Sequence, residues 1–284
     1  MKIKLVHLAT AVCFAGFTAL ATPIPENCLT GGIAISCQAW TFNQFSVMEA
    51  IDKTAAAGGK VIEFYPGQKF SPDKPDQKFD HNASDEMIAA VQARLKERGI
   101  RAVNYGVVGI PKDEAGARKI FEFAKKFELY GITTESVDAL DTIEKLVKEF
   151  DIRLGFHNHP RQPKNPGYKM WDPNYVLSVV KDRDARIGSC SDVGHWVRSG
   201  LNPIDFLKIL QGRVISVHLK DLNEKSADAH DVPFGTGISN VPGILDELKR
   251  QNFAGNASIE YEYNWKDNVV DAAQCIGFVR GRGI

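Results

Sequence analysis

Four residues that can bind a divalent cation each stand at or near the end of a short apolar run, far apart along the sequence. They are Glu135 after 131–134, Asp192 after 186–191, His218 within 214–219 and Glu260 within 257–261. Three carboxylates and one imidazole suit Mn²⁺, Mg²⁺ or Co²⁺, and Zn²⁺ also accepts such ligands. The cysteine spacing excludes an all-thiolate zinc site. Each residue alone could be a surface charge or a helix cap, but four at equivalent positions predict one metal site.

Histidines gather at the ends of the same runs. His157 and His159 end the run that begins at residue 153. An imidazole titrates near neutral pH, so these two rings are candidates for general base and general acid. His195 and Lys220 follow the next two runs. They could hold substrate oxygens or stabilise an enolate beside the metal.

Further polar and aromatic residues are predicted around this site. Glu262 lies two residues after Glu260 on the same strand face, so it could bind substrate or act in catalysis. Aromatic faces combined with a few polar groups suit a sugar-sized pocket, although packing at the mouth of a barrel explains them equally well. The residues expected to line this pocket are Trp40, Glu63, Tyr65, Tyr105 and Arg198.

Short apolar runs alternate with longer amphipathic segments from residue 32 onwards. The runs expected to be buried parallel strands are 32–37, 60–64, 101–105, 131–134, 153–156, 186–191, 214–219 and 257–261. Helical spacing covers 84–98, 113–127 and 140–150. Further helix starts are predicted at Asp172-Pro173, Asn202-Pro203 and Asn240-Val241-Pro242.

This alternation predicts an α/β fold, a single (β/α)8 TIM barrel with its active site at the C-terminal ends of the strands. An open doubly wound sheet is the main alternative. No glycine-rich phosphate-binding sequence follows the first strand, where Cys37-Gln38-Ala39-Trp40 stands instead. The longest loops, 66–82, 160–172 and 221–240, would lie on the C-terminal face of the barrel.

The overall charge gives no sign of a polyanionic partner. The chain of 284 residues has 35 Lys+Arg and 35 Asp+Glu, with 44% hydrophobic residues. We therefore expect no nucleic-acid partner and no association with an anionic membrane surface. The expected partner is a small sugar or keto-sugar, and a homo-oligomer is left open.

The N-terminus predicts export. Residues 1–21 combine Lys2 and Lys4, an apolar stretch and Ala19-Leu20-Ala21, which together are typical of a signal peptide. A buried first helix is the alternative. The mature domain would be residues 22–284 in the periplasm or outside the cell, with no membrane association after signal cleavage. There the sequence leaves open whether the cysteines pair or stay buried thiols, namely Cys28, Cys37, Cys190 and Cys275.

Three motifs resemble a known family when taken together in this order. They are Asp192-Val193-Gly194-His195, Val217-His218-Leu219-Lys220-Asp221 and Ile259-Glu260-Tyr261-Glu262. The chain after the signal peptide resembles the sugar phosphate isomerase/epimerase group (AP endonuclease 2 type) of the xylose isomerase-like TIM barrel superfamily. The resemblance implies a barrel with one divalent metal ion held by Glu135, Asp192, His218 and Glu260.

One departure from the resemblance affects the expected reaction. Ketose epimerases of this group use an acid/base glutamate near the fifth strand, where this chain has His157-Asn158-His159, similar to dehydratase-like members. We expect metal-dependent removal of an α-proton through an enediolate, on a non-phosphorylated sugar or keto-sugar. If the proton is returned to the sugar, the enzyme is a sugar isomerase or epimerase. Loss of a β-substituent makes a lyase or dehydratase acting on an inosose or a 3-keto-glycoside.

Two other classes remain as alternatives at this stage. A non-catalytic sugar-binding barrel would bind a polyol without exchanging its hydrogen. An endonuclease IV-like phosphodiesterase would need extra histidines after the second and third strands, where the sequence has Glu63-Phe64-Tyr65 and Tyr105-Gly106 instead.

Overall fold

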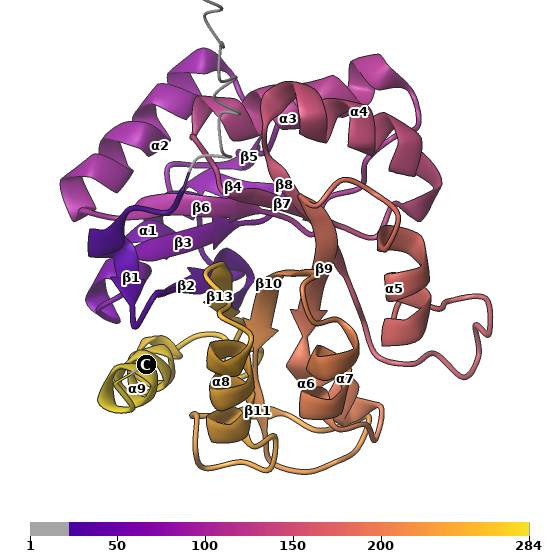
Figure 1. Ribbon diagram of the computed structural model, residues 1–284. Coiled ribbons are helices and arrows are strands. Elements are labelled where there is room, and N and C mark those ends of the chain that lie inside the picture. The colour runs from indigo at the N-terminus through magenta and orange to yellow at the C-terminus, as the bar shows by residue number, and fades with distance from the viewer. Residues whose placement is uncertain (1–22, 284) are drawn as a thin grey trace, which may run out of the picture.

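The computed structural model describes residues 23–283, and a closed barrel of eight parallel strands lies at its centre (Figure 1). The barrel strands are β2 (Ile33–Gln38), β3 (Val61–Phe64), β6 (Arg101–Tyr105), β7 (Gly131–Thr134), β8 (Arg153–His157), β9 (Ile187–Asp192), β10 (Val214–Leu219) and β13 (Asn256–Ile259). Each strand pairs in parallel with the next, and β13 and β3 both pair with β2 to close the ring. The predicted (β/α)8 barrel is confirmed. The predicted signal peptide lies outside the described residues.

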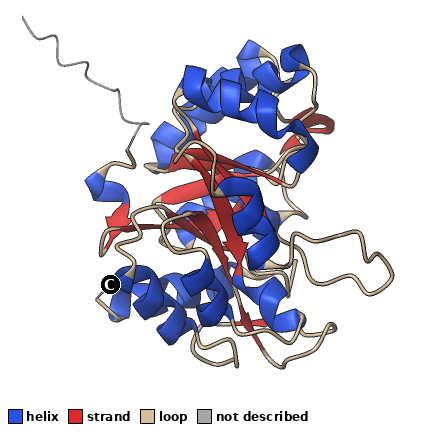
Figure 2. Cartoon of the chain, turned by 45° about the vertical axis from the view of Figure 1, so that its right-hand side comes forward, coloured by secondary structure: helices blue, strands red, loops and turns tan. Residues whose placement is uncertain are grey.

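Helices follow every barrel strand and surround the sheet (Figure 2). They are α1 (Val47–Ala56), α2 (Asp85–Arg98), α3 (Glu114–Lys126), α4 (Leu140–Phe150), α5 (Pro173–Val180), α6 (Val193–Arg198), α7 (Pro203–Ile209), α8 (Val241–Arg250) and α9 (Val269–Gly281). The predicted caps are present: Ser84 accepts a hydrogen bond from Met87 N, and Gly99 ends the same helix in the left-handed region. In Figure 1, α2, α3 and α4 cover one side of the barrel, and α8 and α9 lie on the opposite side.

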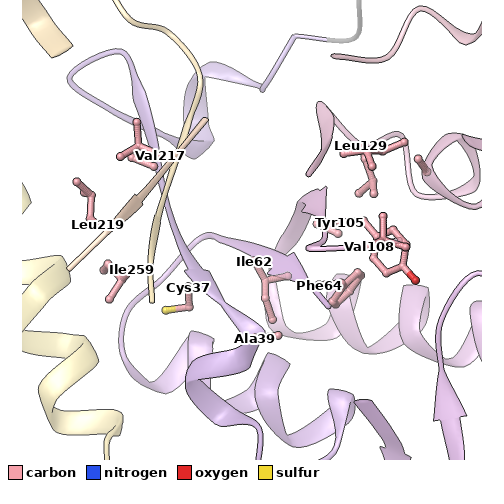
Figure 3. Packing of buried hydrophobic residues seen from close by; sticks show 14 of the residues in the cluster. Cys37, Ala39, Ile62, Phe64, Tyr105, Val108, Leu129, Val217, Leu219 and Ile259 are labelled. Carbon is pink, nitrogen blue, oxygen red and sulfur yellow. The ribbon is translucent and has the colours of Figure 1, made fainter. Parts of the chain in front are cut away.

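Alternation along the strands separates an apolar outer layer from a polar interior. In β10, Val217 and Leu219 pack in the main hydrophobic cluster together with helix residues. His218, between them, points to the barrel interior and contacts Glu63. Figure 3 shows part of the apolar layer, where Ile259 lies near Cys37 of the neighbouring strand. Because successive strand residues face opposite sides, the residues that flank an apolar position are those aimed at the barrel axis.

Two of the three long loops contain short antiparallel pairs that the sequence did not predict. Strands β4 (Gln68–Ser71) and β5 (Lys74–Phe79) form a hairpin after β3, and β11 (Asp221–Leu222) pairs with β12 (Asp231–Val232) after β10. A short strand β1 (Leu29–Thr30) pairs antiparallel with β2. The short 3-10 helices are η1 (Glu26–Cys28), η2 (Ala39–Phe42) and η3 (Val137–Ala139).

The four cysteines within residues 23–283 are free thiols. Cys37, Cys190 and Cys275 are buried and Cys28 is partly exposed, and none forms a disulfide. Among residues 23–283, no helix is both long and apolar enough to span a lipid bilayer.

Candidate metal and substrate site

The four predicted metal ligands come from the carboxyl ends of four barrel strands. Glu135 follows β7, Asp192 ends β9, His218 lies in β10 and Glu260 follows β13. His218 is in register with Asp192 of the neighbouring strand, so both side chains project to the same face of the sheet. Asp192 also caps α6, because its Oδ1 accepts a hydrogen bond of 2.8 Å from the backbone N–H of His195.

Three of these residues converge, and His157 joins them. His218 Nδ1 lies 3.1 Å from Glu260 Oε2 and 3.9 Å from Asp192 Oδ2. His157 Nε2 lies 3.7 Å from the same oxygen of Asp192. One donor atom from each residue lies within 4.8 Å of the others, and all four residues are buried. We refer to His157, Asp192, His218 and Glu260 as the inner cluster.

Glu135 faces His157, at the end of β8, and His159, just after it, rather than the rest of the inner cluster. Its Oε1 lies 3.0 Å from His157 Nδ1 and 2.6 Å from His159 Nδ1, and it accepts a hydrogen bond of 3.2 Å from the Tyr168 hydroxyl. Burial raises the pKa of Glu135, but its bonds to the two histidines outweigh burial and lower the pKa to about 2. An ionised carboxylate only accepts hydrogen bonds. Both rings are therefore protonated at Nδ1, and a neutral ring carries its lone pair at Nε2.

The inner cluster fits a divalent metal ion. His157 Nε2 and Asp192 Oδ2 are buried and have no hydrogen-bond partner, although the Lys220 ammonium lies 3.1 Å from the oxygen. Burial lowers the pKa of His157, but its contacts with Asp192 and Glu135 outweigh burial and raise the pKa to about 9, so without a metal Nε2 carries a proton toward Asp192. A divalent ion can replace that proton between the nitrogen and the oxygen, because metal binding releases protons from its ligands. Imidazole nitrogen and carboxylate oxygen are ligands that Mn²⁺, Co²⁺ and Zn²⁺ accept. The cluster can therefore hold such an ion.

Lys220 is fully buried beside the inner cluster. Its Nζ lies 2.7 Å from Glu262 Oε2 and 2.8 Å from Glu260 Oε2. Burial lowers the pKa of Lys220, but the nearby carboxylates, Asp192 first among them, outweigh it and hold the pKa well above its usual value. The side chain is thus a fixed cation that balances carboxylate charge, and it does not line the cavity described below.

Arg198 orients His195. The guanidinium NH1 lies 3.2 Å from His195 Nδ1 and donates to Glu262 Oε2 at 3.0 Å, while NH2 donates to Asp231 Oδ2 at 2.9 Å. Arginine only donates, so His195 Nδ1 accepts and the ring carries its hydrogen at Nε2. Burial lowers the pKa of His195 well below its usual value, which agrees with a neutral ring.

A cavity of about 320 Å³ opens above the inner cluster. It is lined by Gln38, Trp40, Tyr65, Pro66, Gly106, Val107, His157, His159, His195, Glu260 and Glu262. Trp40 and Tyr65 meet edge to face with ring centroids 5.0 Å apart and form an aromatic wall. The rings of His159 and His195 stack 5.1 Å apart. His157 and Glu260 belong both to the inner cluster and to the wall of the cavity.

Three of the predicted pocket residues lie outside the cavity wall. Tyr105 is buried and its hydroxyl bonds His81 Nδ1 at 3.0 Å. Glu63 is buried in the barrel interior beneath His218, and Arg198 lies behind His195. Of the predicted pocket residues, Trp40 and Tyr65 line the cavity.

Some residues at the site had no usable signal in the sequence. Tyr168 comes from a long loop, and its contact with Glu135 depends on how that loop folds. Gly106 follows β6 directly, and an added Cβ there would lie 1.9 Å from Thr133 Oγ1, so only glycine fits. The other unpredicted wall residues are Gln38, Pro66 and Val107.

A larger cavity lies at the opposite end of the barrel. It has a volume of about 420 Å³ and is lined by residues at the N-terminal ends of the strands, including Tyr130 and Val214. None of the predicted site residues lines it. Barrel enzymes carry their chemistry at the C-terminal face, so the smaller cavity is the candidate substrate site.

The fold and the cluster at its C-terminal mouth define a (β/α)8 barrel protein with an acidic, histidine-rich site. The family described as "Xylose isomerase-like TIM barrel" matches residues 131–277, and the chain belongs to this family. That region contains every member of the inner cluster.

Similar proteins include sugar-converting enzymes. An inosose dehydratase of Clostridium botulinum is 30% identical over 139 residues, a match that covers 43% of this chain and 45% of that protein. An uncharacterized protein from Parabacteroides distasonis is 31% identical, with a TM-score of 0.70 over 88% of this chain and 99% of that chain. A D-allulose 3-epimerase from Methylomonas sp., solved in complex with D-allulose, is 15% identical, with a TM-score of 0.67 over 88% of this chain and 97% of that chain. At this identity the last likeness is one of fold.

Proposed function

We propose that this protein is a divalent-metal-dependent sugar isomerase or epimerase that removes an α-proton from a non-phosphorylated sugar or keto-sugar. The observation that carries the proposal is that His157 and Glu260 belong both to the inner cluster and to the wall of the cavity. A ligand in this cavity would therefore contact the groups that can hold a metal. The sugar epimerases among the structural neighbours support an enzyme of this class.

The cavity wall supports a neutral substrate. Its residues include two carboxylates and three imidazoles but neither lysine nor arginine. Phosphate and carboxylate groups are usually held by arginine, lysine or backbone N–H groups. An aromatic wall beside a few polar groups suits the C–H faces and hydroxyls of a sugar or cyclitol.

We assign the metal to the inner cluster. Asp192, His218 and Glu260 are ligands in common with the sequence prediction, and His157 Nε2 faces them in the fourth position. Once bound, a divalent ion supplies Lewis-acid polarisation of a carbonyl or hydroxyl oxygen. Glu135 as a ligand remains a prediction, because its carboxylate here bonds to His157 and His159.

The two stacked histidines carry complementary roles in this proposal. His159 is half exposed at the cavity, and Glu135 holds its Nδ1–H, so its Nε2 can accept the α-proton of a substrate. His195 presents Nε2–H, because Arg198 occupies its Nδ1, and can donate to a substrate oxygen. One ring thus takes a proton while its neighbour supports the oxygen on which charge develops.

A lyase or dehydratase is the second candidate. The 30% identity to an inosose dehydratase favours it, over a match that covers 45% of that protein's length. The same proton removal would begin either reaction. The outcomes differ in whether the enediolate is reprotonated or expels a β-substituent.

One experiment separates the candidates. Protein loaded with Mn²⁺ is incubated in D₂O with ketoses, inososes and 3-keto-glycosides, and products are followed by NMR and mass spectrometry. Deuterium in a rearranged sugar is the expected result, and loss of water or of an aglycone would identify a lyase. Binding without exchange would contradict both and leave a sugar-binding barrel. Export to the periplasm or beyond stays a prediction, tested by N-terminal sequencing of the secreted chain.

A further inference from the structure

We propose that Glu63 is the positioning residue of the metal site: it holds His218 Nε2 from inside the barrel and so directs His218 Nδ1 to the metal. This inference rests on the proposed function and deepens it. Glu63 lies outside the cavity wall and has no exposed surface, so it does not contact a substrate bound there.

The two ring nitrogens of His218 face opposite directions. Nε2 lies 3.2 Å from Glu63 Oε1, and Nδ1 lies 3.1 Å from Glu260 Oε2 and 3.9 Å from Asp192 Oδ2. A metal bound between Asp192 and Glu260 therefore meets Nδ1, while Nε2 keeps its hydrogen for Glu63. A carboxylate behind a metal-bound imidazole fixes its tautomer and orientation and raises its basicity.

The barrel interior holds the Glu63 carboxylate in place through hydrogen bonds. Its Oε2 accepts hydrogen bonds from Ser258 Oγ and, at 3.1 Å, from Asn256 Nδ2, both on β13. Its Oε1 accepts a bond of 3.3 Å from Thr133 Oγ1 on β7. These donors come from two different strands and leave the carboxylate one remaining partner, the ring of His218.

A buried carboxylate is expensive, which argues for a role beyond packing. Removing a charge from water costs several kcal/mol unless it is paired and hydrogen-bonded. The interiors of such barrels are usually filled with branched apolar residues. Here the layer around Glu63 is polar, and Ser36 Oγ bonds Ser258 Oγ at 2.6 Å within it. Among the contacts of Glu63, the one with His218 leads to the inner cluster.

The first test uses the unchanged protein. Histidine is labelled with ¹⁵N, and His218 is assigned by its loss in His218→Gln. On addition of Zn²⁺ we expect the Nδ1 resonance of His218 to shift while Nε2 stays protonated. A shift of Nε2, or loss of its proton, would overturn the inference while leaving the metal site itself in place.

The second test measures metal affinity in Glu63→Gln, which keeps size and removes charge. We expect the Kd for Mn²⁺ or Co²⁺, from calorimetry, to rise about 10- to 100-fold, with an altered visible spectrum of bound Co²⁺. The matched control is Ser36→Ala, which removes a hydroxyl from the same layer without touching Glu63, and its affinity should match wild type.

The outcomes separate this inference from the proposed function. If Glu63 has only a structural role, Glu63→Gln lowers the melting temperature and leaves the Kd for the metal unchanged. That result overturns the inference alone. A wild-type protein that binds neither Mn²⁺ nor Co²⁺ overturns the proposed function and the inference with it. If Glu63→Gln does not fold, Glu63→Asp and the ¹⁵N measurement on wild type still decide.

Discussion

Residues 33–107 and residues 157–262 each supply one side of the cavity, but with different kinds of side chain. The first group, here the N-terminal side, contributes Gln38, Trp40, Tyr65, Pro66, Gly106 and Val107. The second, the C-terminal side, contributes His157, His159, His195, Glu260 and Glu262. Every titratable imidazole and carboxylate of the wall thus comes from the C-terminal side, and the aliphatic residues and the aromatic Trp40–Tyr65 pair come from the other.

The N-terminal side therefore gives the cavity its shape, and the C-terminal side carries its ionisable groups. The C-terminal side places ionised groups within 3–4 Å of one another, as in the inner cluster, where each depends on its neighbours. The N-terminal side forms a wall whose members contact a ligand largely independently. The residue of this part of the chain that reaches the inner cluster is Glu63, which is buried beneath His218. Substitutions on the C-terminal side should abolish metal binding or turnover, whereas substitutions on the N-terminal side should weaken substrate binding.

The largest effect is expected at His218. His218→Ala removes the ring that joins Glu63 to the inner cluster, so the variant should retain no Mn²⁺ after dialysis and lose at least about 10³-fold in turnover. Metal content by mass spectrometry and turnover of the best substrate are the measurements. His230→Ala, a loop histidine stacked on Tyr263, is the control. Full Mn²⁺ content in the His218 variant would contradict the assignment of His218 as a metal ligand.

The next effect concerns charge balance on the C-terminal side. Lys220→Met leaves Asp192, Glu260 and Glu262 without their shared buried cation, so the metal-free protein should lose about 3–5 kcal/mol of unfolding free energy. Urea unfolding in EDTA measures it, and Mn²⁺ should restore part of the loss because it binds the same carboxylates. Lys225→Met, on an exposed part of the following loop, is the control. Equal stability of the two variants would refute the role of Lys220.

A third prediction concerns the fourth metal ligand. His157→Gln should weaken Mn²⁺ binding about 10- to 100-fold, because it removes the nitrogen that faces Asp192. Glu135→Gln should weaken Mn²⁺ binding less than His157→Gln does, because it removes only the partner of His157 Nδ1, but should lose about 100-fold in turnover, because His159 is no longer oriented. Calorimetry and kcat separate the two. The reverse pattern would establish Glu135 as the ligand, as the sequence predicts.

The smallest effect is expected on the N-terminal side. Trp40→Ala removes half of the aromatic wall and should raise KM about 5- to 10-fold, about 1 kcal/mol, with kcat and Mn²⁺ content unchanged. Steady-state kinetics measure it. Trp171→Ala is the control, since Trp171 stacks with Arg161 away from the cavity. A fall in kcat comparable to that of the Glu135 variant would show that shape and charge are not separated as described.

The strands and helix starts were predictable because their signals are local. Ser84 and Gly99 bound α2 as capping residues do, and Val217-His218-Leu219 alternates as a strand must. The position of Asp192 at a strand end followed from the same reasoning. The prediction of a loop after β3 was incomplete, because it did not include the hairpin β4–β5. This hairpin has few apolar positions that would indicate strands, since Lys74 to Lys78 are exposed.

Side-chain partners were less predictable than strand ends. Glu135 has the residue type and the place of a ligand, yet two histidines at and just after the end of the neighbouring strand, together with Tyr168, bond to its carboxylate. Glu63 was expected to line the pocket because residues near the C-terminal end of a barrel strand usually face the active site. Its neighbours in space, Ser258 and Asn256, are nearly 200 residues away in sequence, and they turn it inward.

The sequence by itself determined the barrel, the face that carries the chemistry and the residue types gathered there, because period and capping are properties of short segments. Only the tertiary structure decided which nitrogen of each histidine faces which carboxylate. Those contacts join β3, β7, β8, β9, β10 and β13, and their geometry depends on register and closure of the whole ring.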